Sequence, residues 1–207
     1  MKYIENPDIK KLSGDSISLF NEVYRENLYI KLITKEFIEA FFDCFDLLDR
    51  EKDLNRSVQL ISHFNSDENL NKIIKQVFKT NKNSRKLVDY LLFLLNQQAN
   101  DKDSIFDICK LISDLLDLTK SSLFYKNDLD SFISICIKTL ESTYTNELRY
   151  HFLNILNKIM SYKDYFEGKY KLDILVEILE NYQVNDHVDE TSQKLSQQIL
   201  EKIESNS

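Results

Sequence analysis

The chain has 207 residues, of which 43% are hydrophobic and 29% charged, and its formal net charge is -7. This mixture is typical of a globular protein with a sizeable core and is too apolar for a disordered chain. With only 2 glycines and 1 proline, the sequence nearly excludes glycine-rich phosphate loops and the tight turns on which most β architectures depend.

Charge, hydropathy and cysteine content exclude further functional classes. The acidic balance argues against a nucleic-acid partner, because phosphate neutralisation requires a concentrated basic stripe. No stretch approaches the roughly 20 apolar residues of a membrane span, and acidic residues interrupt the N-terminal region where a targeting peptide would lie. Cys44, Cys109 and Cys136 are widely spaced among apolar neighbours, which favours buried free thiols over a disulfide or zinc framework. We therefore expect a cytoplasmic protein without a membrane span.

Apolar residues recur at helical spacing from Asp15 onwards, after a polar leader that spans residues 1–14. Clusters of Asn, Asp, Ser and Lys separate the apolar stripes, and capping residues mark where helices begin. The pattern predicts about ten helices, which start at Ser16, after the N-cap Thr34, at Asp53, after Ser66 or Asp67, at the cap Ser84, at Asp103 or Ser104, after the loop 124–127, at Thr145, after Gly168 and after Asp189.

The spacing of the helices indicates a repeat. Starts expected at Ser84, Asn127 and Lys169 lie roughly 40 residues apart, which is the period of armadillo and HEAT arrays. We therefore predict an all-α, armadillo/HEAT-like stacked helical array of about ten helices, folded as a single domain over residues 15–207. A compact multi-helix bundle is the competing architecture, because the repeats are not identical in sequence.

Two aspartate pairs raise the possibility of a metal-dependent enzyme. Asp43 with Asp46, and Asp114 with Asp117, have the spacing with which all-helical prenyl-transferring enzymes hold magnesium. Each pair is interleaved with an apolar stripe, as on an ordinary solvated helix face. The three histidines are scattered, and no serine or cysteine has the local pattern of a nucleophile. We therefore expect no enzyme, no metal and no cofactor, with the magnesium enzyme as the alternative.

Two local features point to a protein partner. Phe124 and Tyr125 stand directly before a helix start, where they serve either as a hydrophobic staple or as exposed rings for a partner. Lysines gather around Gly168 at positions 158, 163, 169 and 171, whereas the stretch from Asp103 to Asp130 is acidic. An acidic edge and a basic edge would suit docking to a protein of mixed charge.

One distinctive motif is the run from Leu123 to Asp130, Leu-Phe-Tyr-Lys-Asn-Asp-Leu-Asp, which precedes an apolar helix. Further motifs are Glu147-Leu148-Arg149-Tyr150, Tyr170-Lys171-Leu172-Asp173, the leucine-rich segment 84–96 and the segment 189–195. Together these segments resemble the leucine-rich domain of the WISH/DIP/SPIN proteins, which activate the Arp2/3 complex, and the run from Leu123 to Asp130 is the most specific of them. The resemblance covers roughly Thr34 to Ile203.

The resemblance implies a protein that binds the side of the Arp2/3 complex, and through it acts on actin, so that unbranched filaments form without a pre-existing filament. It places the protein at the cortical actin cytoskeleton, and we expect a monomer. The residues that match the family's motifs are candidate contacts: Tyr125, Asn127, Asp128, Arg149 and Lys171. If Arg149 is such a contact, Arg149→Glu should weaken partner binding at an unchanged melting temperature. A generic armadillo-like scaffold with another partner is the alternative.

Overall fold

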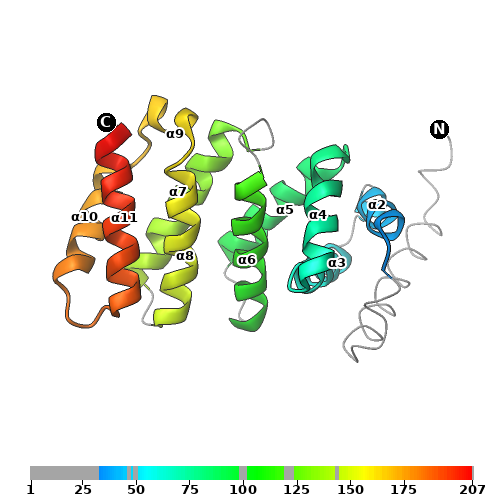
Figure 1. The fold of residues 1–207 in the computed structure, drawn as a ribbon, viewed down its shortest axis with the longest axis horizontal. Helices are drawn as coiled ribbons and strands as arrows, with labels where there is room; N and C mark the ends of the chain where they lie inside the picture. Colours follow the sequence, from blue (N-terminus) through cyan, green and yellow to red (C-terminus); the bar gives the residue numbers. More distant parts are fainter. Residues whose placement is uncertain are drawn as a thin grey trace. The chain divides into compact units, whose positions relative to one another are not determined.

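The structure, a computed structural model, describes residues 33–45, 48, 51–97, 102–118, 124–142 and 145–206. These residues form ten α-helices and no β-strand (Figure 1). The helices are α2 (Lys35–Cys44), α3 (Glu51–Phe64), α4 (Glu68–Thr80), α5 (Ser84–Gln97), α6 (Lys102–Leu118), α7 (Lys126–Ser142), α8 (Asn146–Ile159), α9 (Lys163–Gly168), α10 (Leu172–Val184) and α11 (Glu190–Asn206). The predicted all-α class is confirmed. The expected leader and the helix that starts at Ser16 lie outside the described residues.

Capping side chains fix several predicted helix starts. The Thr34 hydroxyl accepts the backbone N–H of Phe37 at 3.3 Å at the start of α2. The Asp67 carboxylate accepts the N–H of Leu70 at 3.0 Å before α4, and Asp189 accepts the N–H of Ser192 at 3.0 Å before α11. Each bond satisfies a backbone donor that has no partner within the helix, which is why these residue types marked helix starts correctly.

Some helix starts differ from the prediction by one or two residues. The third helix begins at Glu51 rather than at Asp53, α6 begins at Lys102 rather than at Asp103 or Ser104, and α7 begins at Lys126, within the expected loop 124–127. Helix α5 begins at Ser84 as predicted, but Ser84 does not cap it, because the side chain of Asn81 accepts the N–H of Asn83 at 2.8 Å and turns the chain one step earlier. Among the described residues, the buried Ser84 hydroxyl has no hydrogen-bond partner.

The segment around Gly168 also departs from the prediction. The sequence predicts a helix directly after Gly168, but Gly168 ends the short helix α9, and α10 begins at Leu172. Tyr165 of α9 is fully buried, so one residue anchors a helix that is too short to show an apolar stripe. Lys169 and Lys171 then take left-handed backbone angles, with φ of 47° and 51°, and these angles separate the two helices.

The chain forms two compact units, Met1–Ile108 and Cys109–Ser207. In the first unit α2 packs on α4, and α3 packs on α4 and α5. Its centre is aromatic: Phe41 lies edge-to-face against Phe45 and Phe64, with ring centroids 6.0 Å and 6.5 Å apart. The single domain expected over residues 15–207 stays a prediction.

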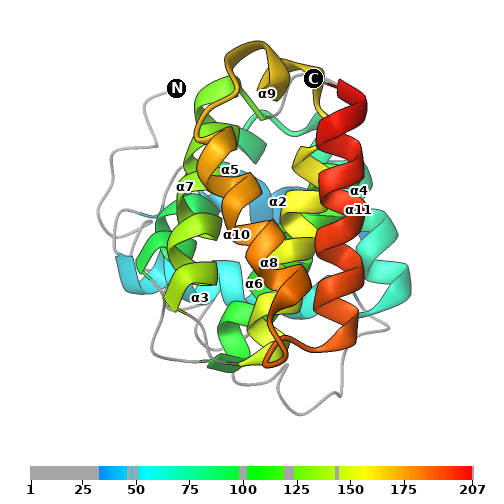
Figure 2. The same ribbon diagram turned by 90° about the vertical axis from the view of Figure 1, so that its left-hand side faces the viewer.

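The second unit is built from two layers of helices. One layer contains α7 and α10, the other contains α8 and α11, and each of these helices contacts its neighbour in the same layer or across the layers (Figure 2). The apolar stripes recognised in the sequence meet between the layers, where Phe132, Cys136, Phe152, Leu175 and Ile199 are fully buried. This packing is that of a stacked helical array.

Polar side chains link each repeat to the preceding one at the ends of helices. Tyr162 donates to the carbonyl of Leu116 at 2.6 Å, Tyr182 to that of Leu140 at 2.8 Å, and Lys202 to that of Asn157 at 2.7 Å. These pairs are 46, 42 and 45 residues apart in sequence, close to the expected repeat length. The last carbonyls of a helix lack partners within it. Each of these bonds therefore provides such a carbonyl with a donor from the next repeat.

Candidate functional site

Two of the four expected magnesium ligands have ordinary structural partners. Asp43 accepts a hydrogen bond from the side chain of Asn81 at 3.0 Å, and Asp117 forms an ion pair with Lys158. Asp46 lies outside the described residues. Within the part of the chain that the structure describes, no group of three or more His, Cys, Asp or Glu side chains could hold a metal ion. Asp43 and Asp117 thus have structural contacts, and the expectation that the protein is not an enzyme stays a prediction.

The cysteines are free thiols in poorly reactive surroundings. Cys109 and Cys136 are buried in the second unit, and burial raises the pKa of both thiols. Cys44 is half-buried, and its pKa is raised by burial and by the charge of Asp43. Since the thiolate is the nucleophile, a raised pKa disfavours nucleophilic chemistry at all three positions.

Four of the five predicted contact residues lie at the starts of α7 and α10 in the second unit, and three of these four are exposed. Tyr125 and Asn127 are exposed at the start of α7, and Lys171 is exposed at the start of α10. The side chain of Lys126 lies against Gly168, where an added Cβ would be 2.6 Å from its Nζ, and so joins the start of α7 to the α9–α10 turn. We call the exposed residues Tyr125, Lys126, Tyr170 and Lys171 the turn surface.

Hydrogen bonds hold the turn surface in a defined shape. The Tyr165 hydroxyl donates to the carbonyl of Tyr170 at 3.0 Å from within the core. Lys171 Nζ donates to Ser134 Oγ at 3.2 Å and lies 5.3 Å from the centroid of the Tyr170 ring. Ser134 in turn donates to the Tyr170 hydroxyl at 3.2 Å. The hydrogen bond from Ser134, together with the charge of Lys171, lowers the pKa of Tyr170. The hydrogen bonds of Tyr165 and Lys171 therefore stabilise the turn in which Lys169 and Lys171 have left-handed backbone angles.

Phe124 and Tyr125 divide the two roles that the sequence leaves open. Phe124 is buried and packs against Phe132 with ring centroids 5.7 Å apart, which is the structural role. Tyr125 is 60% exposed, so its ring is accessible from solvent, and its role as a partner contact stays a prediction. The loop thus uses one ring to fix its own position and presents the other.

Asp128 performs a structural task in the same loop. Its side chain is 5% exposed, and its Oδ2 accepts the backbone N–H of Tyr125 at 2.7 Å. This is the reaching-back half of a capping box, in which an acidic residue in the first turn satisfies the donor at the cap. As a partner contact Asp128 stays a prediction, whereas Asn127 and Tyr125 beside it are exposed.

Arg149 lies away from the turn surface, at the start of α8, and is 7% exposed. Its guanidinium donates to Asn146 at 2.6 Å, lies 3.7 Å from the carboxylate of Asp189, and lies 5.3 Å from the centroid of the Tyr182 ring. Burial raises the pKa of Asp189, but hydrogen bonds from Ser192 and the charge of Arg149 outweigh it, so the net pKa is lowered. This arrangement ties α8 to α10 and to the start of α11.

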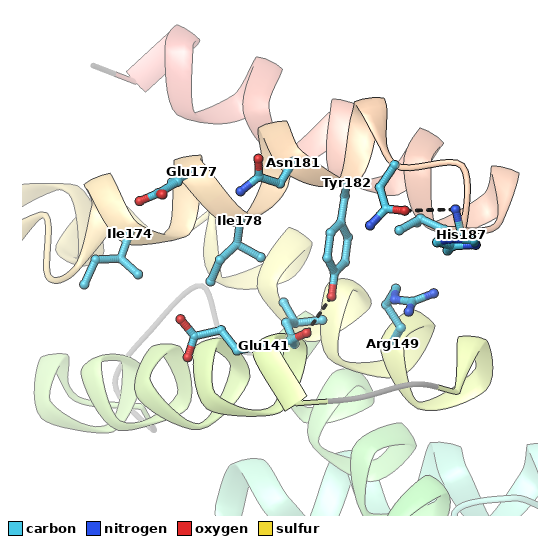
Figure 3. A pocket seen from close by; sticks show the side chains of 11 residues that line it. Glu141, Arg149, Ile174, Glu177, Ile178, Asn181, Tyr182 and His187 are labelled. Carbon is cyan, nitrogen blue, oxygen red and sulfur yellow. Dashed lines mark hydrogen bonds between the residues drawn. The ribbon is translucent and has the colours of Figure 1, made fainter.

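A groove of about 560 Å³ extends along α10 from this network (Figure 3). Its apolar side chains include Ile174 and Ile178 of α10, and two carboxylates, Glu141 of α7 and Glu177 of α10, line the same space. Arg149, Tyr182 and His187 lie at the other end. We call this feature the acidic groove. The sequence does not predict this groove, although the run of acidic and apolar residues in α10 is a partial signal for it.

The predicted acidic and basic edges are not separate. Lys158 of the expected basic edge forms an ion pair with Asp117 of the expected acidic stretch. Lys126, from the acidic stretch, lies against Gly168 at the centre of the expected basic edge. The charged side chains at these positions therefore form contacts within the second unit.

The sequence matches the family described as SPIN90/Ldb17, leucine-rich domain, over residues 47–175. A comparison with curated proteins gave no match. Among solved structures, the crystal structure of an engineered protein aligns with a TM-score of 0.46 and 16% identity, covering 97% of this chain and 89% of that chain.

Proposed function

Since the chain belongs to the family of the SPIN90/Ldb17 leucine-rich domain, we propose that it binds the Arp2/3 complex and activates it to nucleate unbranched actin filaments without a pre-existing filament. The observation that carries the proposal is the family match over residues 47–175, which supports an actin-related role in general. All five candidate contact residues fall within the matched range. The Arp2/3 complex as partner, and its activation, are the proposed steps.

The turn surface is the part of the molecule that we assign to this partner. Tyr125, at 60% exposure, offers a large amphipathic ring at the start of α7, and Tyr170 and Lys171 are held in a fixed geometry by hydrogen bonds with Ser134 of the same helix. Aromatic residues on a rigid support are typical of the positions that dominate a protein interface. Asp128 and Tyr165 support the loop and the turn from within.

Activation by such a surface is a shift between two arrangements of the partner. A protein that binds the active arrangement more tightly than the inactive one raises the population of the active one by that ratio of affinities. A stiff helical array suits this task, because little binding free energy is lost in ordering the surface. The mechanism requires neither a cofactor nor a catalytic residue.

Among the described helices, none is long and apolar enough to cross a bilayer. We propose that the protein acts at the cortical actin cytoskeleton.

The test is a fluorescent actin-assembly assay with purified protein and Arp2/3 complex, without filament seeds or another activator, followed by imaging of the products. We expect faster assembly and linear filaments. Tyr125→Ala and Lys171→Glu should weaken binding to the complex, whereas Lys110→Glu, which reverses an exposed charge on α6, should behave like the wild type. The absence of both acceleration and binding would contradict the proposal.

A generic protein-binding scaffold with another partner is the second candidate. The acidic groove favours it, because the groove is a shaped surface that the turn surface does not include. If the wild-type protein does not bind the Arp2/3 complex but retains a folded, cooperative structure, this second function takes its place.

A further inference from the structure

We propose that the acidic groove binds a segment of another protein in which cationic side chains border an apolar stripe. The groove, of about 560 Å³, lies within the range typical of pockets that hold a ligand or a few side chains of a partner. The inference goes beyond the Arp2/3 proposal and does not depend on it. It rests on the apolar residues, the charges and the rigidity of the groove.

One apolar side chain of the groove remains in contact with solvent. Ile174 is 43% exposed, although Leu175 and Leu179 on the same helix are fully buried. Ile178 and Leu140 lie further along the same groove and are already buried, so they form its apolar floor. Covering Ile174 would remove apolar surface from water. An apolar stripe on the incoming segment would supply that cover.

The charges around the apolar residues favour a partner segment that carries positive charge. Glu141 and Glu177 line the groove from two different helices, and α10 itself contains three acidic residues and no lysine or arginine. Among the described residues that line the groove, Arg149 is the one lysine or arginine, and it already lies beside Asp189 and Asn146. A lysine or arginine of the partner could lay its aliphatic stem along Ile174 and reach a carboxylate with its charged end.

Other classes of occupant fit these observations less well. A phosphate backbone or an anionic lipid surface would meet two carboxylates at the groove. A second copy of this chain carries a net charge of -7, so the two molecules would repel each other at long range. A basic segment of a different protein is attracted instead.

The end of the groove is held rigid before any partner arrives. The Tyr182 hydroxyl donates a hydrogen bond of 2.8 Å to the carbonyl of Leu140, and the Arg149 guanidinium lies over the Tyr182 ring. The Asn185 side chain accepts the backbone N–H of His187 at 2.9 Å, which fixes the turn beyond α10 (Figure 3). A preformed groove binds with a smaller ordering penalty than one that must assemble.

Two matched peptides provide the probe. Both are fluorescein-labelled amphipathic helices with leucines at the same positions, and one has lysines beside the leucine stripe where the other has glutamates. Fluorescence anisotropy at low salt should show that the wild-type protein binds the lysine peptide about tenfold more tightly than the glutamate peptide. The double variant Glu141→Lys/Glu177→Lys should reverse this preference.

The control is Glu167→Lys/Glu204→Lys, which makes the same charge change at exposed positions on α9 and α11 outside the groove and should keep the wild-type preference. Ile174→Asp should weaken binding of the lysine peptide without loss of helical circular dichroism. Equal binding of both peptides by the wild type, or an equal effect of the groove and control variants, would overturn the proposal. Self-association that disappears in Glu141→Lys/Glu177→Lys would assign the groove to a second copy and would overturn it too.

Discussion

The hydroxyl of Tyr182 donates a hydrogen bond of 2.8 Å to the carbonyl oxygen of Leu140, 42 residues earlier in the chain. The acceptor lies in the last turn of α7, where carbonyl groups have no partner within the helix. The donor lies on α10, the next helix in the same layer, and its ring also carries the guanidinium of Arg149 on one face. One side chain therefore ends a helix, joins two repeats and supports the end of the acidic groove.

Tyr182→Phe tests this link. The variant keeps the ring and removes only the hydroxyl, so the Leu140 carbonyl loses its side-chain donor. We expect the free energy of unfolding to fall by about 1 kcal/mol and the melting temperature by about 2–4 °C. Tyr125→Phe, which removes a hydroxyl from an exposed ring, should leave the melting temperature unchanged. Equal melting temperatures for Tyr182→Phe and the wild type would show that the bond adds nothing to stability.

Arg149→Glu is expected to destabilise the protein. Sequence alone favours Arg149 as a surface contact, but at 7% exposure it lies against Asp189 and the Tyr182 ring. Glutamate would place a second carboxylate there and leave both charges without a cation, at a cost of about 3 kcal/mol. Thermal unfolding should show a melting temperature several degrees lower. Arg149→Lys keeps the charge and should lose less, and an unchanged melting temperature in Arg149→Glu would restore the assignment as a contact.

The same network predicts a pH dependence. The pKa of Asp189 lies below its ordinary value of 3.8, because hydrogen bonds from Ser192 and the charge of Arg149 outweigh the effect of burial. A carboxyl group whose folded-state pKa is lowered contributes stability that is present above the unfolded pKa and is lost as the pH falls through the folded pKa. The stability difference between the wild type and Asp189→Asn should therefore shrink as the pH falls from about 6 to about 3. Denaturant titrations at several pH values measure it, and a constant difference would contradict the assignment.

Asp128 and Asn127 form a matched pair of neighbours with different roles. Asp128→Ala removes the acceptor for the N–H of Tyr125 and should lower the free energy of unfolding by about 1 kcal/mol. The side chain of Asn127 is exposed, so Asn127→Ala should be close to neutral for stability. Chemical denaturation of the two variants in parallel separates capping from partner contact. Two equal losses would mean that the capping geometry does not decide the effect.

The sequence predicted those parts of the fold that depend on local signals. Helix starts at Thr34, Asp67 and Asp189 were predictable because a single capping side chain satisfies donors a few residues away. Helix α9 was not predictable from its pattern, because it has six residues and depends on one buried ring, Tyr165. The start of α5 at Ser84 was predicted correctly, but its cap was misassigned, because Asn81, three residues before Ser84, provides the turn.

The candidate site shows the same division between features that local sequence signals predict and features that depend on how the helices pack. The exposure of Tyr125 beside the buried Phe124 was one of two readings that the sequence left open, and the structure assigns one ring to each. The burial of Arg149 was not readable, because its partner Asp189 lies 40 residues further along the chain and meets it only when α8, α10 and α11 pack together. The acidic groove was missed for the same reason, since its two carboxylates belong to different helices.

The two buried cysteines of the second unit have a use as natural reporters. Cys109 and Cys136 are covered by neighbouring side chains, and their raised pKa values keep them as thiols. Reaction with an alkylating reagent therefore has to wait until the surrounding helices separate, whereas the half-buried Cys44 of the first unit should react sooner. Mass-resolved labelling over time would then yield the opening rate of the second unit in the unmodified protein. A partner that clamps this unit would be detected as a slower alkylation of Cys109 and Cys136, without any dye or tag.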